Sequence, residues 1–397
     1  MRNARSVAVF IVFALNGVQL GSWSGRVPAL ANQVHAGPGG LGLALLGTSI
    51  GLILAAPFAG RLCARFGGRW VVVSSAVLVS LVLPLLGLAT SIPLLGGALF
   101  LLGAAAGMLD VSMNVLAVAV VRGLDRPLMP VFHAAYSFGG LAGSLGASLA
   151  AQADWSPFRQ FLVVAGVSLA GVLAVTRGMP GARPEPGQRA ARKPTIAPIR
   201  RRVLWLLAIV ALCSAVAEGS CSDWSALFLV RERGLAPATA ATGYAAFSIA
   251  MALFRLFGER WERRWGPHRL VASGGVLAAA GFLAAASIPW WGVGYLGFVL
   301  AGAGLAFAFP VALGLAGAAG RRADGHGGEH ELGFVTTIAY GGFLAGPPLI
   351  GFVAQASNLA VALGMVGFIA LAMAPAVVIA RRARDKEVAQ VTAVVGG

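Results

Sequence analysis

Twelve long apolar stretches follow one another along this chain, and they constrain its fold more than any other feature. A transmembrane helix needs about 20 mostly apolar residues, and each stretch reaches or approaches that length. Of the 397 residues, 58% are hydrophobic and only 11% are charged. A soluble protein of this length needs more charge to cover its surface, so the apolar excess must face lipid. The stretches run approximately over residues 6–30, 41–60, 70–89, 93–121, 127–152, 157–177, 203–230, 236–257, 269–288, 291–318, 332–354 and 357–380.

The basic residues between these stretches indicate how the chain is oriented. If both termini are cytoplasmic, 25 of the 30 Lys and Arg residues lie on the cytoplasmic side, and three lie in outer loops. This asymmetry follows the positive-inside rule. We therefore predict a multi-pass protein of the bacterial inner (plasma) membrane with both termini in the cytoplasm. The net charge of +16 is distributed as orientation signals, and no nucleic-acid-binding motif accompanies it, so we expect no nucleic-acid partner.

Short matches between distant parts of the sequence indicate two related halves. Four matches occur in corresponding helices at nearly the same offset, between 198 and 204 residues. They pair Trp23-Ser24 with Trp224-Ser225, Ser49-Ile50 with Ser248-Ile249, Gly60 with Gly258, and Ala135-Tyr136 with Ala339-Tyr340. Two such bundles in parallel repeat, with a site between them, are typical of a rocking transporter.

The predicted fold is therefore all-α, with twelve transmembrane helices in two pseudo-symmetric six-helix bundles. A stretch that is rich in proline and basic residues and lacks an apolar period separates the two bundles and is typical of a linker. We expect an N-terminal bundle over 1–178, a cytoplasmic linker over 179–202, a C-terminal bundle over 203–380 and a cytoplasmic tail over 381–397.

The sequence gives no sign of an enzyme or a metalloprotein. Its three cysteines form no CxxC or Cys/His spacing, and there is no GxSxG, HExxH or P-loop motif. Asp324, His326, Glu329, His330 and Glu331 form a small polar cluster, which we interpret as a solvated loop rather than a metal site. We expect no cofactor, and we expect a monomer in the lipid bilayer.

A motif of glycines and charged residues follows the second helix and recurs in the second half. The copies contain Gly60, Arg65, Gly67 and Arg69, then Gly258, Glu262 and Arg263. The motif resembles the cytoplasmic loop signature of the major facilitator superfamily, although Ala64 replaces the acid of the first copy. Glycine permits the tight turn, and the charges can form exchangeable salt bridges that latch the inner gate. The alternative is a merely basic loop.

A closer resemblance covers nearly the whole chain. Its motifs are Gly21-Ser-Trp23-Ser-Gly-Arg26-Val-Pro28, Asp110-Val-Ser-Met113-Asn114, His133-Ala-Ala-Tyr136-Ser137-Phe-Gly139-Gly140 and Asp223-Trp224-Ser225. Together they resemble a poorly characterised bacterial branch of the major facilitator superfamily, related to fucose-permease-type sugar–proton symporters. The resemblance implies the major facilitator fold and proton-coupled movement of a small polar solute. It does not name the solute.

Two acids at membrane depth are candidates for proton coupling. An ionisable side chain inside the bilayer is costly, so it marks a pathway or a proton relay by default. Asp110 lies near the middle of the fourth helix, and Glu218 lies slightly outside the middle of the seventh. Alternatively, Asp110 pairs permanently with Arg26 or caps a broken helix. Fucose-permease-type symporters also use an acid in the first helix, where this chain has Asn16 and Gln19.

Polar and aromatic residues on several helices are candidates for contact with the solute. Asn16, Gln19, Trp23 and Arg26 share one face of the first helix, because they are spaced by three, four and three residues. The other candidates are Asn114, His133, Tyr136, Trp224 and Tyr340. For Trp23 and Trp224 the alternative is anchoring at the membrane interface. For His133 the alternative is a hydrogen-bonded packing role.

We therefore predict a secondary active transporter that works by alternating access on a sugar-like solute. Gly139, Gly143 and the Gly346-Pro347-Pro348 run are expected to bend or closely pack the fifth and eleventh helices. The fifth helix lacks the Gly-Pro signature of drug–proton antiporters, which counts modestly against drug export. A proton-driven exporter of metabolites or drugs is the alternative. A membrane-embedded enzyme and a sensor that does not transport are further alternatives.

Overall fold

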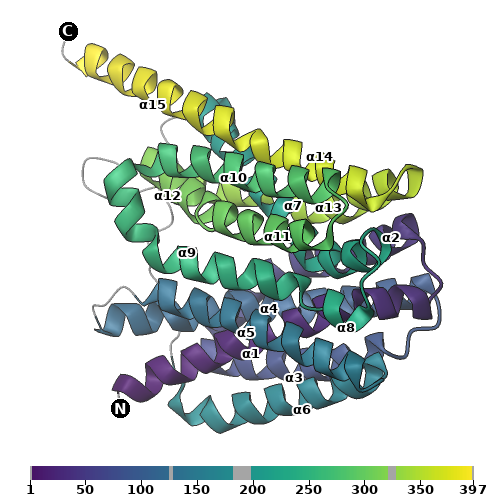
Figure 1. Ribbon diagram of the computed structural model, residues 1–397. Helices are drawn as coiled ribbons and strands as arrows, with labels where there is room; N and C mark the ends of the chain where they lie inside the picture. The colour runs from purple at the N-terminus through teal and green to yellow at the C-terminus, as the bar shows by residue number, and fades with distance from the viewer. Residues whose placement is uncertain (1, 125–127, 182–197, 321–327, 396–397) are drawn as a thin grey trace.

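Every regular element of the computed structural model is a helix in the residues that it describes, which are 2–124, 128–181, 198–320 and 328–395. The first helix begins and the last helix ends on the same side of the molecule (Figure 1). We call this side the terminal face and the opposite side the far face. The described part of the chain leaves out most of the predicted linker. It also leaves out Asp324, His326 and the side chain of Glu329.

The first half contains six long helices that alternate in direction. They are α1 (Arg2–Gln33), α2 (Pro38–Phe66), α3 (Gly68–Leu86), α4 (Ile92–Leu124), α5 (Met129–Gln152) and α6 (Pro157–Val175), followed by the short 3₁₀ helix η1 (Thr176–Gly178). Pro38 and Pro157 occupy the first turn of their helices, where the missing N–H of proline is tolerated. These helices lie in the lower part of Figure 1.

The second half follows the same plan, but three of its helical spans are divided. Its elements are η2 (Pro198–Arg200), α7 (Arg202–Arg231), α8 (Pro237–Ala240), α9 (Gly243–Trp265), α10 (Pro267–Ser287), α11 (Trp291–Leu305), α12 (Ala308–Gly320), α13 (Glu329–Ala356), α14 (Leu359–Leu371) and α15 (Met373–Val395). The divided spans are α8–α9, α11–α12 and α14–α15. The last of these continues through the predicted tail as a helix.

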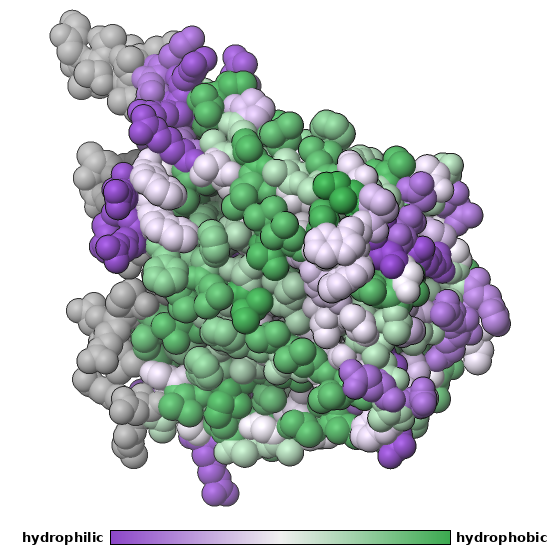
Figure 2. All heavy atoms as spheres, viewed as in Figure 1, coloured by the Kyte–Doolittle hydropathy of each residue, from purple (hydrophilic) through white to green (hydrophobic). Residues whose placement is uncertain are grey.

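The helices agree with the predicted membrane spans. Eleven segments of the described chain are long and apolar enough to cross a bilayer. α5 completes the set of twelve, since its 24 residues extend about 36 Å and pack along α1. Figure 2 shows hydrophobic residues over the middle of the molecule and hydrophilic residues toward the two faces. The prediction of an all-α membrane protein with twelve helices is confirmed.

Close helix crossings depend on glycine, as expected for packing within a membrane. A Cβ atom at Gly17 would overlap the carbonyl of Tyr136, and one at Gly139 would overlap the carbonyl of Ala14. Gly143 lies equally close to α1, so α1 and α5 approach each other along several turns. The predicted close packing of the fifth helix is confirmed.

The two halves touch through α2 with α13, α5 with α9, and α1 with α7. The hydrogen bonds between described residues of the two halves lie at mid-depth or toward the far face. Arg231 donates to the carbonyl of Ala36 at 3.2 Å, and the Ser144 hydroxyl donates to the carbonyl of Ala241 at 2.5 Å. The described residues toward the terminal face form no such bond across the halves. This structure is therefore closed at the far face.

Candidate functional site

Polar side chains from both halves converge near the middle of the helices. Tyr136 on α5 lies close enough to Asp110 on α4, Glu218 on α7, and Tyr244 and Arg255 on α9 to interact with each of them electrostatically. Together with His133 and Tyr340, we name these residues the central cluster. Charged groups at this depth indicate a pathway for a polar solute or for protons.

Asp110 is exposed, although it lies midway along its helix. Its charge acts on Tyr136 in the first half and on Tyr340 in the second, so it faces the space between the halves rather than lipid. The Asn114 amide donates to the Asp110 carboxylate at 3.3 Å and to its backbone carbonyl at 2.9 Å. Asp110 and Asn114, which were predicted separately, therefore form one hydrogen-bonded unit.

The alternative in which Asp110 pairs with Arg26 is wrong for this structure. Arg26 is buried toward the far face, where its guanidinium donates to the Gln160 side chain and to the carbonyl of Trp155. Both partners belong to α6 or to the loop before it. Its donors thus join α1 to α6, and Arg26 does not reach the central cluster.

Glu218 has a partner that sequence reasoning missed. The Arg255 Nη2 atom lies 3.9 Å from the Glu218 Oε2 atom, and both side chains are mostly buried. The Arg255 Nε atom also donates to the carbonyl of Ala306 at 3.2 Å, at the break between α11 and α12. In the sequence Arg255 is only an arginine inside an apolar stretch. Its position at membrane depth is the signal that could have identified it as a functional candidate.

The remaining candidates on the first helix occupy different surroundings. The Asn16 amide lies 3.6 Å from the sulfur of Met113 on α4. Gln19 is buried, and its side-chain oxygen has no hydrogen-bond partner among the described residues. Trp23 is only 5% exposed, and it lies within hydrogen-bonding reach of Asp223 on α7. The predicted stripe on α1 therefore extends from the central cluster into the closed contact between the halves.

Trp224, the repeat partner of Trp23, is fully buried, and within the described part of the chain its indole nitrogen has no hydrogen-bond partner. Because neither tryptophan reaches the lipid interface, the anchoring alternative does not describe this structure. The indole of Trp224 and the side-chain oxygen of Gln19 are buried polar atoms without partners, which is costly unless another state or a ligand satisfies them.

The histidine and tyrosine candidates lie toward the terminal face. The His133 ring packs edge-on against Phe13, with 5.4 Å between the ring centroids, and it also interacts electrostatically with Arg255. Tyr340 on α13 interacts with Asp110 across the halves. The structure thus brings His133, Tyr136 and Tyr340 to the same central cluster as the two acids.

The two copies of the predicted gate motif form corresponding turns. Gly67 joins α2 to α3 with a φ angle of 86°, and Gly266 joins α9 to α10 with a φ angle of 78°. These positive angles favour glycine at both turns. A Cβ atom at Gly60 would have no described neighbour within 4 Å, whereas a Cβ atom at Gly258 would lie 2.8 Å from the Phe307 ring.

The charged residues of the motif remain largely on the surface. Arg65 is exposed and lies over the Phe66 ring at 5.2 Å, and Glu262 and Arg263 are exposed near the end of α9. Arg69 donates to the carbonyl of Met179, just beyond η1. Between described residues, no ion pair crosses the halves at the terminal face, so a closed latch is not seen in this structure.

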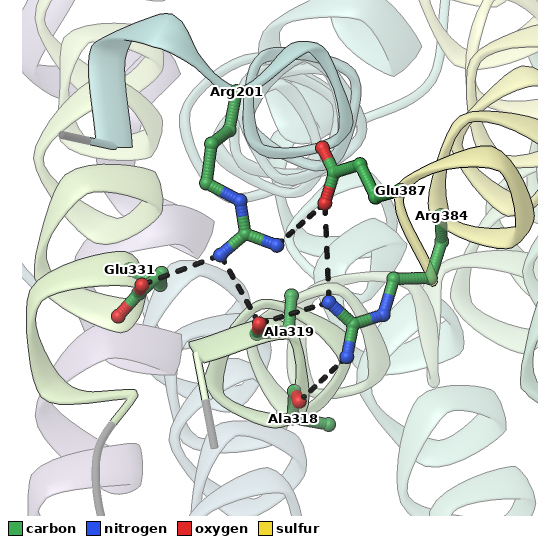
Figure 3. A network of polar contacts seen from close by, with 6 residues as sticks. All are labelled: Arg201, Ala318, Ala319, Glu331, Arg384 and Glu387. Atoms are coloured by element: carbon green, nitrogen blue, oxygen red, sulfur yellow. Dashed lines mark hydrogen bonds and ion pairs between the residues drawn. The ribbon is translucent and has the colours of Figure 1, made fainter. Parts of the chain in front are cut away.

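Glu331 does not belong to a solvated loop, contrary to the expectation from sequence. It is buried in the first turns of α13 and forms an ion pair with Arg201 at 3.3 Å. Figure 3 shows that Arg201 also pairs with Glu387 at 2.6 Å, and that Arg384 donates to the carbonyl of Ala319 at 2.9 Å. This network secures the end of α12 to the start of α7, to α13 and to α15.

Comparisons with known proteins agree with this arrangement of helices. The sequence matches the family model of the Major Facilitator Superfamily over residues 9–325 and 225–395. An uncharacterised MFS-type transporter of Yersinia pestis is 34% identical over 374 residues, which cover 94% of each chain. The uncharacterised transporter y4wD of Sinorhizobium fredii is 32% identical over 367 residues, which cover 91% of this chain and 94% of the relative.

Solved structures share the fold at low sequence identity. A bacterial homologue of the human lysosomal transporter Spinster, in an inward-facing and unoccupied conformation, has a TM-score of 0.79 at 14% identity, with 97% and 98% of the two chains covered. A mutant form of the nucleoside transporter NupG has a TM-score of 0.78 at 14% identity, with 94% of this chain and 99% of that chain covered.

The fucose:proton symporter FucP of E. coli is a more distant structural neighbour. Its TM-score is 0.61 at 19% identity, with 94% of this chain and 98% of FucP covered. At this identity the likeness shows the fold alone. The predicted resemblance to a bacterial transporter family is confirmed, whereas the closer relation to fucose permeases reduces to a distant likeness in fold.

Proposed function

The chain belongs to the major facilitator superfamily of secondary transporters, and from this premise we propose that it moves a small polar, sugar-like solute together with protons. The terminal face lies in the cytoplasm of a bacterium, and the bundles of residues 1–178 and 203–380 rock about the site between them. Because the halves meet at the far face, the site is then open toward the cytoplasm.

The state of Asp110 is the observation that carries this proposal. Asp110 is an exposed carboxylate near the middle of the membrane, and among the described residues no Lys or Arg forms an ion pair with it. An isolated charge at this depth is costly. A proton that binds Asp110 removes that charge, and it can do so when the pathway opens to water on either side.

Glu218 is the second proton-coupling residue in this proposal. It differs from Asp110 in having a cation, Arg255, at 3.9 Å. Protonation of Glu218 would therefore release an existing ion pair, whereas protonation of Asp110 would neutralise an unpaired acid. The two acids lie in different halves, so their proton exchange can follow the relative movement of the bundles.

The solute contacts in this proposal come from both halves. Asn16, Asn114, His133, Tyr136 and Tyr340 offer amide, imidazole and hydroxyl groups around the two acids, which suits a solute with several hydroxyls. Gln19, Trp23 and Trp224 join them when the far face opens, since Gln19 and Trp224 now have buried polar atoms without partners among the described residues.

Proton flux into proteoliposomes is the direct test of the proposed function. A pH-sensitive dye is enclosed, and a panel of sugars and small polar metabolites is added outside in turn. We expect one solute class to acidify the interior, because a symporter carries protons inward with its solute. Alkalinisation driven by a solute would instead establish a proton-driven exporter. Solute movement without any pH change would contradict proton coupling.

A further inference from the structure

The span formed by α11 and α12 is interrupted at a carbonyl that has lost its usual donor. α11 ends at Leu305 and α12 begins at Ala308. In a continuous helix the carbonyl of Ala306 would accept a hydrogen bond from the N–H group of residue 310. That residue is Pro310, which has no N–H and whose ring crowds the same carbonyl. Ala306 is fully buried, so its carbonyl needs another donor.

Arg255 supplies that donor from the neighbouring helix α9. Its Nε atom donates to the carbonyl of Ala306 at 3.2 Å, and its Nη2 atom lies 3.9 Å from the Glu218 Oε2 atom on α7. A single guanidinium group thus connects three spans at the same depth. Its planar set of donors permits this double contact, because Nε and Nη2 each carry their own N–H groups.

Two further residues on the same side of α9 contact the break. Gly258 lies so close to the Phe307 ring that a Cβ atom there would be 2.8 Å from it. Trp261 packs edge-on against the same ring, with 5.9 Å between centroids. Arg255, Gly258 and Trp261 are spaced by three residues and therefore share one face of the helix.

We propose that Arg255 is a positioning residue that holds the break between α11 and α12 against α9. In this proposal the charge on Glu218 determines whether Arg255 keeps its contact with the break. When Glu218 is charged, it orients the guanidinium toward α7 and keeps Nε on the Ala306 carbonyl. When Glu218 is neutral, the guanidinium loses this restraint, and the two parts of the divided span can move relative to α9. Divided helices commonly form the central sites of transporters, so a change at this break would act close to such a site.

This inference rests on the proposed function in one respect, which is that Glu218 gains and loses a proton. The titratable groups around the pair are His133 and Tyr136 on α5 and Cys221 and Tyr244 on α7 and α9. Asp110 on α4 lies on the other side of Tyr136. Substitution of Glu218 itself separates its contribution from that of these neighbours.

Distances between spin labels on the terminal face test the inference without a solute. Labels are placed at Phe66 and Arg269, one in each half, in protein whose cysteines are replaced by alanine and which is held in lipid nanodiscs. The ratio of open to closed populations is measured at acidic and at alkaline pH. We expect Arg255→Gln to lower this ratio about tenfold at alkaline pH, as loss of a hydrogen bond from a charged donor predicts.

The companion variants make the result specific. Glu218→Gln should lower the ratio as much as Arg255→Gln does, and the double variant should lower it no further. Pro310→Ala restores an N–H group for Ala306, so Arg255→Gln should have little effect in that background. Arg255→Lys keeps the charge but has one nitrogen for two partners, so it should give an intermediate ratio and serves if the glutamine variant does not fold. Arg260→Gln, at an exposed position of α9, is the matched control.

Independent, additive effects of Arg255→Gln and Glu218→Gln would overturn the inference. So would an Arg255→Gln variant that behaves as Arg260→Gln does. Transport of a solute from the panel without any proton movement would refute the proposed coupling. It would not affect the spin-label result, in which Arg255→Gln lowers the open population. The two failures are therefore distinguishable.

Discussion

Trp23 on α1 lies within hydrogen-bonding reach of Asp223 on α7, and this contact joins the two halves on the side where they are closed. Asp223 also accepts a hydrogen bond from the Ser222 hydroxyl at 3.1 Å. Trp23 itself is almost completely buried. In alternating access, contacts of this kind must break when the far face opens, so they set how often it opens.

Trp23→Phe should therefore loosen the far face, because phenylalanine keeps an aromatic ring but cannot donate to Asp223. We expect the rate at which a membrane-impermeant maleimide labels Cys221 from the far face to rise about fivefold, in protein that retains only this cysteine. Trp290→Phe, at an exposed tryptophan, is the control. Equal labelling of Trp23→Phe and the control would show that the contact does not restrain opening.

Substitution within the α1–α5 crossing should destabilise the first bundle. A Cβ atom at Gly139 would overlap the carbonyl of Ala14, so Gly139→Ala must push the helices apart at a cost of about 1–3 kcal/mol. Gly146 lies on the same helix with no neighbour within 4 Å of the added atom. Thermal unfolding in detergent should show a lower Tm for Gly139→Ala and an unchanged or higher Tm for Gly146→Ala.

The two copies of the gate motif should respond differently to the same change. Gly258→Ala places a methyl group against the Phe307 ring, whereas Gly60→Ala meets open space. We expect Gly258→Ala to cost about 1 kcal/mol or more and to slow transport, and Gly60→Ala to be close to neutral. Tm and the initial rate of transport are compared for the two variants. Equal effects would mean that the contact with the α11–α12 break has no consequence.

The network at the terminal face should contribute to the stability of the second bundle. Glu331→Gln removes the charge that pairs with Arg201, although Arg201 keeps Glu387 at 2.6 Å. Because Glu331 is buried, we expect a loss of about 1–3 kcal/mol in unfolding free energy. The control is Glu262→Gln, at an exposed glutamate. Matching denaturation midpoints for the two variants would contradict this role.

The helices could be predicted from sequence because lipid imposes a simple rule, that a span needs about 20 apolar residues. The same rule identified Asp110 and Glu218, since charge is rare at that depth. The breaks within the helical spans of the second half were harder to predict from the sequence. Pro310 marks one of them, but only the fold shows that Arg255 reaches the carbonyl that this proline leaves free.

Pairing between distant residues could not be predicted in this way. Arg26 shares a helical face with Asn16, but at the far end of α1 its nearest acceptors are Gln160 and the carbonyl of Trp155, on the neighbouring helix and loop. Glu331 follows a glycine-rich stretch and was therefore interpreted as a loop residue. In the structure it pairs with Arg201, which lies 130 positions earlier in the chain. Such contacts depend on how helices pack, which local sequence does not specify.

The central claim, that Asp110 couples solute movement to protons, is tested most directly by comparing Asp110→Asn with the unchanged protein in proteoliposomes. Two signals are recorded for the solute that the panel identifies, namely internal acidification and exchange of labelled for unlabelled solute. Asp154→Asn, at an exposed aspartate of the far face, controls for loss of one acid. We expect Asp110→Asn to abolish acidification and to retain exchange. Acidification that persists at the unchanged rate in Asp110→Asn would contradict the claim.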